Sequence, residues 1–408
     1  MKVAVIGGGA AGLMAAYTAA EGGAQVTLFE KNEKCGKKIY ITGKGRCNVT
    51  NDCGAQEYLT HVVRGSKFLM GAVYSFPPRS LMDFLESGGL KLKTERGNRV
   101  FPASDKASDV TKCLENYCRN AGVEICFNSE ILNLSILNST MRGIITQNGE
   151  LLFDRVIVCT GGKSYPSTGS TGDGYKFAEH AGHSIVPPVP SLCGVNLSGD
   201  YFRGMQGLSL RNVALKVYVG DKLLRVLFGE MQFTHFGASG PLILTASALI
   251  NRERTENVRL VLDFKPALDD EQLDRRLLRD FEGDKNKDLS NCLKALLPAS
   301  LIEPLLARCG IAAWKKVNSV TKAERAALLT NIKNFDMLFL SLRGFEEAVI
   351  TSGGVALKEI NPKTMESKLV SGLYFCGEVL DCDAFTGGFN LQIAFSTGYA
   401  AGRAAAKA

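Results

Sequence analysis

Lys2-Val-Ala-Val-Ile6 and the run Gly7-Gly-Gly-Ala-Ala-Gly12 that follows it are the stretch of sequence that decides the fold. The first segment is short, apolar and rich in β-branched residues, which predicts a buried strand. The glycines have G-x-G-x-x-G spacing, and an Ala-rich helix is expected from Leu13 to Glu21. A second strand, Gln25–Phe29, ends on Glu30. Because all these parts arrive in order, they predict a dinucleotide site rather than a plain strand–helix–strand turn.

Each residue type in this motif has a physical task in binding a dinucleotide. Gly7 permits the tight turn, Gly9 lets the backbone approach a pyrophosphate, and Gly12 lets the helix pack closely on the strand. The N-terminus of the helix offers unpaired N–H groups and a positive dipole end to the phosphates. The carboxylate of Glu30 can accept hydrogen bonds from an adenosine ribose.

The composition indicates an ordinary soluble globular protein of two or three domains. The chain has 408 residues, of which 45% are hydrophobic and 22% are charged. Its net charge of +7 is modest for this length, and a solvated surface explains it as well as attraction to phosphate-bearing ligands does. No basic stripe with interleaved aromatic residues is visible in the sequence, so nucleic acid is not a favoured partner.

Cysteine usage and hydropathy favour a cytoplasmic protein that does not span a membrane. The twelve cysteines include no C-x-x-C pair and no disulfide framework, which favours reduced thiols. The longest apolar stretches are too short or too interrupted by glycine to cross a bilayer. The N-terminus resembles a secretion signal, but cleavage there would remove the nucleotide motif, so we reject that interpretation. No metal site is predicted.

A basic loop that contains glycine follows the second strand and runs from Gly36 to Asn48. Cations and backbone N–H groups in such a loop can cradle the phosphates of a cofactor, whereas an exposed basic loop without a ligand is the alternative. The spacing from Gly36 to Gly43 is not that of a P-loop, so no nucleoside triphosphate site is predicted. The cations of the loop are Lys37, Lys38, Lys44 and Arg46.

Two later strands also end on small residues. The apolar segment Asp154–Val158 precedes Cys159-Thr160-Gly161-Gly162, and small residues leave room for a cofactor to lie across a strand end. The segment Gly372–Cys376 precedes Gly377-Glu378, and a Gly-Gly pair then introduces a helix that runs to Arg403. The N-terminus of that helix could donate N–H groups to an electron-rich ring oxygen. A tight turn and a terminal strand–helix unit are the respective alternatives.

The character of the sequence changes after three prolines between positions 187 and 190. Short strands with polar alternation are expected between 191 and 264, and helices between 269 and 333. Trp314 is expected to anchor the packing of these helices. His235 lies in a turn, Phe233–Pro241, that introduces an apolar helix. It is the one candidate for a catalytic side chain, although we favour a structural histidine at a domain contact.

Four segments together resemble the BaiN-like (YhiN-like) flavoproteins, a family that also includes the aminoacetone oxidases. They are Gly7–Glu30, Lys37–Asn51, Thr234–Pro241 and Gly377–Asp381, and the resemblance extends nearly from end to end. It implies an α/β fold in which a Rossmann-like FAD-binding domain is split by an inserted β-barrel domain and a small helical subdomain. The expected boundaries are 1–189 and 354–408 for the FAD-binding domain, 190–265 and 336–353 for the barrel, and 266–335 for the helices.

The resemblance also implies which residues bind the FAD. The glycine turn with Ala11 would hold the pyrophosphate, Glu30 the adenosine ribose, and the backbone of Ile131 would face the adenine. Asn390 and Leu391 would present backbone N–H groups to the flavin ring. The full implied set is Gly7, Gly9, Ala11, Gly12, Glu30, Lys31, Lys38, Arg46, Asn48, Ile131, Thr160, Gly161, Gly377, Glu378, Asn390 and Leu391.

The same resemblance implies an FAD-dependent oxidoreductase. We expect it to use NAD(P)H to reduce an activated, enone-type double bond in a hydrophobic organic small molecule. No second clear G-x-G-x-x-G is present, so NAD(P)H would bind transiently at the flavin face. Cys35 and Cys47 are too far apart in sequence for the redox pair of the disulfide reductases, so dithiol chemistry is not expected.

Two other functions stay open. One is an amine oxidase of the aminoacetone oxidase type, which would use O2 and release peroxide. The other is a basic flavoprotein that binds or modifies RNA, which predicts salt-sensitive RNA binding. The scattered lysines argue against the second. The sequence indicates neither the physiological substrate nor the oligomeric state.

Overall fold

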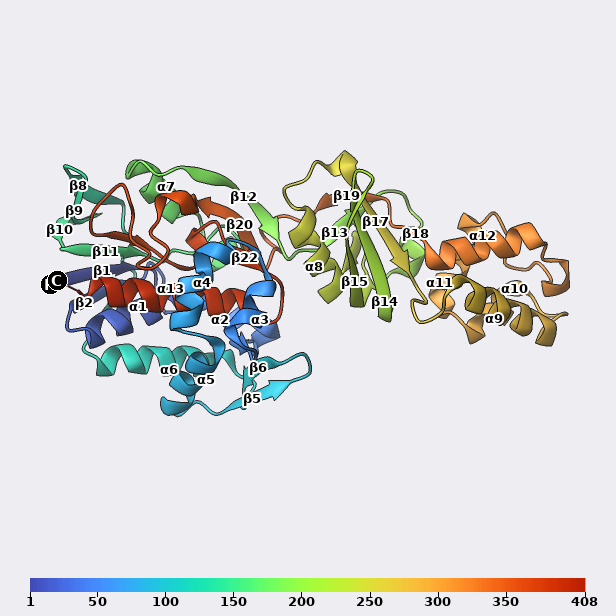
Figure 1. Cartoon of the computed structure of the whole chain (residues 1–408), viewed down its shortest axis with the longest axis horizontal. Coiled ribbons are helices and arrows are strands. Elements are labelled where there is room, and N and C mark those ends of the chain that lie inside the picture. The colour runs from blue at the N-terminus through green and yellow to red at the C-terminus, as the bar shows by residue number, and fades with distance from the viewer. Residues whose placement is uncertain (408) are drawn as a thin grey trace. The chain divides into compact units, whose positions relative to one another are not determined.

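A five-stranded parallel sheet forms the centre of the first of two compact units (Figure 1). The computed structural model describes residues 1–407, and the first unit comprises Met1–Ser191 and the segment from Gly344 onward. All neighbouring strands of the sheet are parallel, so their carboxyl ends meet at one edge. The strand order is β21 (Leu373–Phe375), β11 (Arg155–Val158), β1 (Lys2–Ile6), β2 (Gln25–Phe29) and β7 (Glu124–Cys126).

The central strand β1 forms where the sequence predicts it. Val3, Ala4 and Val5 are fully buried, because helices cover both faces of a parallel sheet and its strands therefore consist of continuous apolar runs. The register aligns Ile6 with Phe29 on one side and with Val158 on the other. The turns that follow β1, β2 and β11 consequently lie side by side.

Helices α1 (Ala10–Glu21) and α13 (Phe389–Ala405) pack against each other with almost no side chain between them. A Cβ atom added at Gly398 would lie 2.5 Å from the carbonyl oxygen of Ala11. One added at Gly402 would lie 2.4 Å from the carbonyl oxygen of Ala15. Glycine is required for an approach this close, so α13 is fixed against the helix that begins at the glycine turn.

Short sheets and further helices surround this core. Strands β8 (Asn133–Leu137), β9 (Thr140–Thr146) and β10 (Gly149–Leu152) form an antiparallel meander. The remaining elements of the first unit are α2 (Lys37–Ile41), β3 (Thr50–Asn51), α3 (Ala55–Thr60), β4 (Val62–Arg64), α4 (Ser66–Ser75), α5 (Pro78–Ser87), β5 (Leu92–Glu95), β6 (Arg99–Pro102), α6 (Ala107–Asn120), α7 (Asp173–His180), β12 (Ile185–Ser191), β20 (Ile350–Val355) and β22 (Asp383–Ala384).

The prolines near position 188 lie in β12, the last strand before the first unit gives way to the second. β12 pairs antiparallel with β20, and its register shifts between Val186 and Val189. Pro187 and Pro188 stand at this irregularity, which is where a strand tolerates residues that cannot donate a ladder hydrogen bond. The expected domain boundaries at 189/190 and 353/354 therefore fall inside paired strands, and they stay predictions.

The second unit, Leu192–Arg343, is built on a seven-stranded antiparallel sheet. Its two edge strands, β18 and β19, are joined by Met337 and Leu338, so the edges of the sheet approach each other as in a barrel. The strand order is β18 (Phe335–Asp336), β17 (Val258–Asp263), β14 (Ser209–Val219), β15 (Lys222–Phe233), β16 (Gly237–Ser239), β13 (Val195–Leu197) and β19 (Phe339–Leu342).

Helices complete the second unit and share one apolar core with its sheet. Capping boxes begin two of them: Asp269 with Gln272, and Thr321 with Glu324, each satisfy two backbone N–H groups. The helices are α8 (Pro241–Ile250), α9 (Asp270–Gly283), α10 (Leu289–Cys292), α11 (Ala299–Arg308) and α12 (Lys322–Lys333).

The prediction that Trp314 anchors the packing of these helices is wrong. Its side chain is 77% exposed. Leucines fill the core instead, and Leu273, Leu301 and Leu328 are each fully buried. Trp314 lies in the connection between α11 and α12, where its position in the sequence carries no apolar periodicity that could have indicated its burial or exposure.

None of the helices described in residues 1–407 combines the length and the apolar character that a membrane crossing requires.

Candidate functional site

Four of the predicted segments meet at the carboxyl edge of the parallel sheet in the first unit. A Cβ atom added at Gly7, after β1, would lie 2.7 Å from the carbonyl oxygen of Cys159, after β11. One added at Gly377, after β21, would lie 2.8 Å from the Cβ atom of Ala11. The N–H group of Gly8 donates to the carboxylate of Glu30, after β2, over 2.8 Å. Segments separated by hundreds of positions in the sequence thus form one surface.

The glycine turn has the geometry of a pyrophosphate cradle. Gly7 has φ of 104°, in the left-handed region, and its N–H group donates to the carbonyl oxygen of Phe29. A Cβ atom added at Gly12 would lie 1.8 Å from the carbonyl oxygen of Gly7, so the helix rests directly on the turn. A Cβ atom added at Gly9 would meet no described atom within 4 Å. Open space therefore lies where the backbone would approach a phosphate group.

The N-terminus of α1 faces this space with its hydrogen-bonding groups available. Gly9 is the N-cap residue, and within residues 1–407 no side chain caps the helix and no acid stands in its first turn. The first N–H groups of a helix have no partner inside the helix. A diphosphate would satisfy them and would interact favourably with the helix dipole. The turn and the helix together fit the pyrophosphate of FAD.

Glu30 is 7% exposed, and three N–H donors hold its carboxylate in place. One oxygen accepts from the N–H of Gly8 over 2.8 Å, and the other accepts from the backbone and side-chain nitrogens of Asn32 over 2.8 and 2.6 Å. Each carboxylate oxygen has two lone pairs, so the oxygen facing Gly8 can accept a further hydrogen bond from a ribose hydroxyl. The backbone after Glu30 also receives the N–H groups of Asn128 and Ser129, which lead to the buried Ile131.

Lys38 forms a partly buried ion pair with Glu378, 340 positions later in the chain. The Lys38 ammonium lies 2.7 Å from the Glu378 carboxylate and 2.6 Å from the hydroxyl of Ser164. Glu378 also accepts from Ser164 and from the backbone N–H of Thr351, over 2.8 and 2.9 Å. The Thr351 hydroxyl in turn accepts from the backbone N–H groups of Lys163 and Ser164. This network fixes the segments that follow β11 and β21 relative to α2.

Lys31 forms a second ion pair near the carboxyl end of β2. Its ammonium lies 2.6 Å from Asp173 and 2.7 Å from the hydroxyl of Thr171. Burial raises the pKa of Asp173, but the hydrogen bonds from Lys31 and Thr171 outweigh it and hold that pKa below its ordinary value.

Sequence analysis did not predict the hydroxyl groups of these two networks, which belong to Ser164, Thr351 and Thr171. No local pattern marks a hydroxyl group whose hydrogen-bond partner stands more than a hundred positions away in the sequence.

Arg46 and Asn48 stand in different surroundings although they belong to one loop. The Arg46 guanidinium binds Glu95 and Asp105, and it lies 4.2 Å above the ring of Phe101. The Asn48 side-chain oxygen is buried and has no hydrogen-bond partner among the described residues. The Thr160 hydroxyl is also buried and also has no hydrogen-bond partner among the described residues. Unsatisfied buried polar atoms cost about 1–3 kcal/mol each, so Asn48 and Thr160 fit a bound polar group better than Arg46 does.

The N-terminus of α13 is a second open helix end. Its N-cap Gly388 has φ of 95°, and a Cβ atom there would lie 2.3 Å from the carbonyl oxygen of Thr50. The side chain of Asn390 bonds to the backbone of Ala384 and Phe385, which holds the preceding loop in place. The backbone N–H groups of Asn390 and Leu391 belong to the first turn, so they have no partner inside the helix. They are the donors that the family resemblance implies for a flavin ring, and that assignment stays a prediction.

His235 lies in the second unit, in the turn between β15 and β16. Its side chain is exposed, and its ring stands 5.1 Å from that of Phe236. A hydrogen bond from the N–H of Thr234 to the carbonyl oxygen of Gly237 closes the turn. Its role as a catalytic side chain stays a prediction.

Burial disfavours the thiolate form of several cysteines in the first unit. Burial raises the pKa of Cys35, and it raises the pKa of Cys47 to about 12. Cys159 and Cys376 follow β11 and β21, and their sulfur atoms lie 3.1 Å apart. Burial, together with the thiol of Cys376, raises the pKa of Cys159 well above its ordinary value. All twelve cysteines are free thiols.

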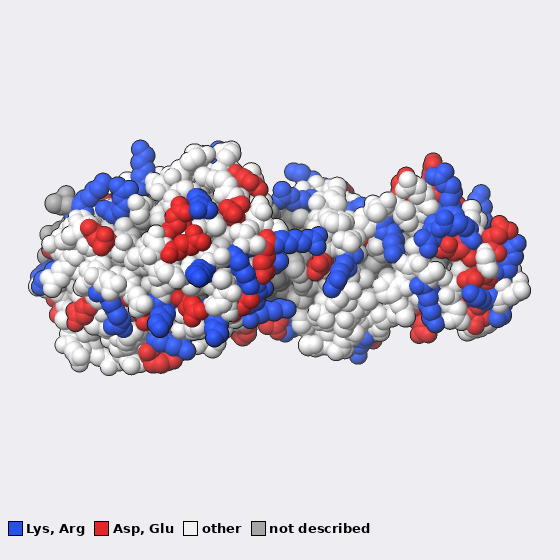
Figure 2. All heavy atoms as spheres, turned by 90° about the horizontal axis from the view of Figure 1, so that it is seen from below, with Lys and Arg blue, Asp and Glu red and all other residues white. Residues whose placement is uncertain are grey.

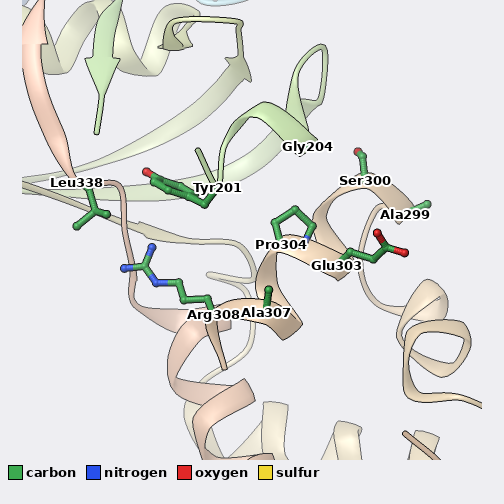
Figure 3. A pocket seen from close by; sticks show the side chains of 9 residues that line it. All are labelled: Tyr201, Gly204, Ala299, Ser300, Glu303, Pro304, Ala307, Arg308 and Leu338. Atoms are coloured by element: carbon green, nitrogen blue, oxygen red, sulfur yellow. The ribbon is translucent and has the colours of Figure 1, made fainter. Parts of the chain in front are cut away.

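A separate pocket of about 750 Å³ lies in the second unit, between α11, the segment before β14 and the β18–β19 connection (Figure 3). Tyr201, Pro304 and Leu338 form its apolar walls. The guanidinium of Arg308 reaches it, but this group already donates to the carbonyl oxygen of Asp336 over 2.6 Å. None of the predicted site residues lines this pocket.

Across residues 1–407, no three His, Cys, Asp or Glu side chains are grouped to hold a metal ion.

Comparisons with known proteins agree with this geometry. Residues 1–404 match the family described as the HI0933-like protein Rossmann domain. A 3-dehydro-bile acid delta(4,6)-reductase from Clostridium scindens is 33% identical over 100% of this chain and 99% of the relative. A ribosomal RNA dihydrouridine synthase from Haemophilus influenzae is 30% identical over 97% of this chain and 96% of the relative.

One solved structure supports the fold alone. The 3-ketosteroid-delta4-(5alpha)-dehydrogenase from Rhodococcus jostii RHA1 is 15% identical, with a TM-score of 0.53 over 100% of this chain and 97% of that chain. The predicted Rossmann-type α/β fold is confirmed by the family match and by this likeness.

Proposed function

The chain belongs to the HI0933-like Rossmann-domain family, and from that premise we propose that it uses NAD(P)H to reduce a carbon–carbon double bond conjugated to a carbonyl group. The predicted family and the predicted class, an FAD-dependent oxidoreductase, are confirmed. The electron donor, the bond reduced and the residues assigned to the site are the proposal.

The observation that carries the proposal is the chemistry shared by two relatives that match nearly the whole chain. One is named a reductase of the delta(4,6) bonds of a 3-dehydro-bile acid, where the double bonds are conjugated to a ketone. The other is named a dihydrouridine synthase, and dihydrouridine arises by reduction of the uracil ring double bond next to a carbonyl. The two substrates differ in size and charge. The enone-type bond is what they have in common.

The geometry of the first unit supports FAD as the cofactor for this reaction. The open space at Gly9 and the N-terminus of α1 would hold the pyrophosphate, and Glu30 would bind the ribose. Asn390 and Leu391 would donate their backbone N–H groups to the flavin ring, where the helix dipole favours negative charge. The chemistry that FAD supplies when bound is hydride transfer. The Lys38–Glu378 network would keep these parts in register with one another.

Anaerobic spectroscopy tests the donor and the substrate class in sequence. Purified protein is titrated with NADH and then with NADPH while the flavin absorbance bands are recorded. We expect bleaching by one of the nucleotides, return of the bands when a steroid enone is added, and a product that carries two additional hydrogens. Bands that stay oxidised with both nucleotides would contradict the donor. Turnover of an amine with release of peroxide would support the oxidase alternative instead.

A second candidate substrate is a uracil base in RNA, favoured by the full-length similarity to the dihydrouridine synthase. It is the same reaction on a different molecule, because the uracil double bond is also conjugated to a carbonyl. This candidate departs from the expectation that nucleic acid is not a favoured partner. Incubation of ribosomal RNA with the reduced protein, followed by nucleoside analysis for dihydrouridine, distinguishes it from a reductase of free small molecules.

A further inference from the structure

A buried polar cluster in the first unit brings together His183, Ser367 and Glu359, which no sequence pattern connects. Basic and acidic side chains are interspersed over the face drawn in Figure 2, so charge alone marks no binding surface there. The interior is more informative. The side chain of His183 is fully buried, and Ser367 is 6% exposed. Polar groups at this depth need defined hydrogen-bond partners.

The hydrogen bonds of Ser367 determine where the protons of the cluster lie. Its hydroxyl oxygen accepts from the backbone N–H groups of Leu369 and Val370, over 3.0 and 2.9 Å. A hydroxyl oxygen has two lone pairs, and these two bonds occupy both. The hydroxyl proton is left to be donated, and the Nε2 atom of His183, 2.7 Å away, is its acceptor.

This arrangement selects one tautomer of His183. A ring nitrogen that accepts a hydrogen bond carries no proton, so the proton of the neutral ring lies on Nδ1. Nδ1 stands 3.3 Å from the carboxylate of Glu359, although not in the alignment of a hydrogen bond. An imidazolium would turn Nε2 into a second donor toward Ser367. One hydrogen bond of that hydroxyl would then have to break, which disfavours the charged ring.

The order serine, histidine, acid is also that of a hydrolase triad, but this serine is unsuited to attack a substrate. A nucleophilic hydroxyl needs a free lone pair and access to the substrate. Both lone pairs of Ser367 are engaged by backbone N–H groups, and its side chain is buried. The cluster therefore has a task other than hydrolysis.

Glu359 is the acid that faces the ring of His183. Its carboxylate accepts from the backbone N–H and the hydroxyl of Ser184, both over 2.8 Å. Burial raises the pKa of Glu359, but the hydrogen bonds from Ser184 and the nearby His183 hold it below its ordinary value. Lys358 lies 3.8 Å from the same carboxylate, and its side chain is 78% exposed.

The other charged groups of the elements around the ring are directed elsewhere. Glu366 accepts from a backbone N–H group, and Lys368 donates to a backbone carbonyl oxygen. Burial lowers the pKa of His183, and this effect outweighs the opposite effect of Glu359. The remaining charged or titratable side chains of α7 that are exposed are Lys176, Glu179 and His180.

The cluster holds the strand that leads into the proposed cofactor site. The backbone N–H of Ser367 donates to the carbonyl oxygen of Leu373, in β21, over 2.7 Å. The ring of His183 stands edge-on to the ring of Phe375, with 5.1 Å between their centres. Phe375 is the last residue of β21, and Glu378, which pairs with Lys38, follows three positions later.

We propose that His183 is a positioning residue that, as the neutral Nδ1–H tautomer, holds β21 through Ser367 and thereby keeps Glu378 in the proposed cofactor site. Protonation of the ring breaks the bond to Ser367 and loosens this strand. Bound FAD should therefore be released more readily as the pH falls through the range in which His183 takes up a proton. The effect on FAD rests on the proposed function, whereas the tautomer does not.

Nuclear magnetic resonance tests the tautomer directly. Long-range proton–nitrogen spectra of the FAD-bound, histidine-labelled protein distinguish the two neutral tautomers from the imidazolium. The chain has four histidines, and the signals of His183 are identified by their loss in His183→Gln or by their shift in Ser367→Ala. We expect the Nδ1–H tautomer at about pH 7.5 and half-protonation only below 6.5. An Nε2–H tautomer, or an imidazolium at about pH 7.5, would overturn the proposal.

Flavin release tests the link to the cofactor site. The rate at which free flavin fluorescence appears is compared at about pH 7.5 and about pH 5, where most carboxylates are still ionised. In the original protein we expect a rise of about tenfold at the lower pH, as for the loss of one buried hydrogen bond. In His183→Gln the amide oxygen still accepts from Ser367 but does not titrate, so the rise should stay below about threefold.

Two further variants complete the comparison. His183→Leu has no acceptor for the Ser367 hydroxyl and should release flavin rapidly at both pH values. His180→Gln, at an exposed histidine three positions earlier, should behave as the original protein does. An equal rise in the original protein and in His183→Gln would overturn the proposal.

Failure here is distinguishable from failure of the proposed function, because flavin release is measured without an electron donor or a substrate. A flavin that stays oxidised with both NADH and NADPH would count against the reductase and leave the role of His183 intact. Normal bleaching and turnover, together with flavin release that does not depend on pH, would overturn the role of His183 alone.

Discussion

The interiors of the two units of this protein are packed in different ways. In the first, backbone packs on backbone: the helix after the glycine turn rests on the turn itself at Gly12, and α13 rests on α1 at Gly398 and Gly402. In the second, leucine side chains fill the space between the helices and the sheet, and backbone packs closely on backbone within the sheet at Gly237, where an added Cβ atom would lie 2.4 Å from the carbonyl oxygen of Val195. A contact of backbone on backbone leaves no room for an added atom, whereas a contact between side chains can adjust its rotamers. The proposed cofactor site lies in the less tolerant region.

The largest expected effect is that of Gly12→Ala. The added methyl group would stand 1.8 Å from the carbonyl oxygen of Gly7, and backbone on both sides leaves no side chain that could move away. We expect the free energy of unfolding of the first unit to fall by about 3 kcal/mol, with loss of bound FAD. Thermal unfolding and the flavin-to-protein absorbance ratio measure both effects. An unchanged midpoint would contradict the backbone-packed description of this region.

Gly9→Val should separate cofactor binding from stability. Gly9 caps α1 with φ of −82°, and an added Cβ atom meets nothing within 4 Å, so the variant should fold normally. The side chain would occupy the space of the pyrophosphate, and loss of two charge-assisted hydrogen bonds should weaken FAD binding about a hundredfold.

Gly54→Val is the matched control for Gly9→Val. Gly54 caps α3 with φ of −69°, and it too has no described atom within 4 Å of an added Cβ. It should bind FAD as the original protein does. Fluorescence titration of the apoprotein with FAD compares the two variants, and equal affinities would contradict the assignment of Gly9 to the pyrophosphate site.

Lys38→Met should have a moderate effect on stability. It leaves the Glu378 carboxylate, 21% exposed, without its cationic partner, while Ser164 and Thr351 still donate to it. We expect the free energy of unfolding, measured in urea, to fall by about 2 kcal/mol.

Lys285→Met is the matched control. It removes an exposed ion pair with Glu282 in the second unit and should change the free energy of unfolding by less than about 0.5 kcal/mol. Comparable losses in the two variants would remove the distinction between the networks.

Asp173→Asn should have a small effect that depends on pH. The folded-state pKa of Asp173 lies below its ordinary value of 3.8, because hydrogen bonds from Lys31 and Thr171 outweigh the effect of burial. A depressed pKa contributes stability that is present above the unfolded pKa and is lost as the pH falls through the folded one. The free energy of unfolding of the original protein should therefore exceed that of the variant by at most about 1 kcal/mol at pH 7. This difference should shrink once the pH falls below 3.8 and vanish below the folded-state pKa. Urea unfolding across this range measures it, and a difference that persists at low pH would contradict the ion pair.

The smallest expected effect has the opposite sign. Gly283 is the last residue of α9, and a Cβ atom added there meets no described atom within 4 Å. Gly283→Ala should stabilise the second unit by about 0.4 kcal/mol, because alanine restricts the unfolded chain without a clash in the folded one. A small rise in the unfolding midpoint is the readout. A fall in the midpoint would contradict the open space around Gly283.

Sequence reasoning succeeds where the physical cause is local. The path from Gly7 to Glu30 is predictable because strand, turn, helix and acid follow one another within thirty residues. The prediction for Trp314 is wrong, because the general tendency of indole to be buried says nothing about one residue in an irregular connection. The Lys38–Glu378 pair spans 340 positions, and only the register of the parallel sheet brings its members together.

The contact between α1 and α13 has a consequence for how the molecule is made. Residues 192–343 are contiguous, so the second unit can fold as soon as it leaves the ribosome. The first unit cannot, because β21 and α13 are translated last and α1 first. Translation proceeds at about 5–20 residues per second, so α13, which carries Gly398 and Gly402, is synthesised tens of seconds after α1. During synthesis, the edge where β21 will be added to β11 stays open, and an unpaired strand edge of this kind makes a nascent chain prone to aggregation.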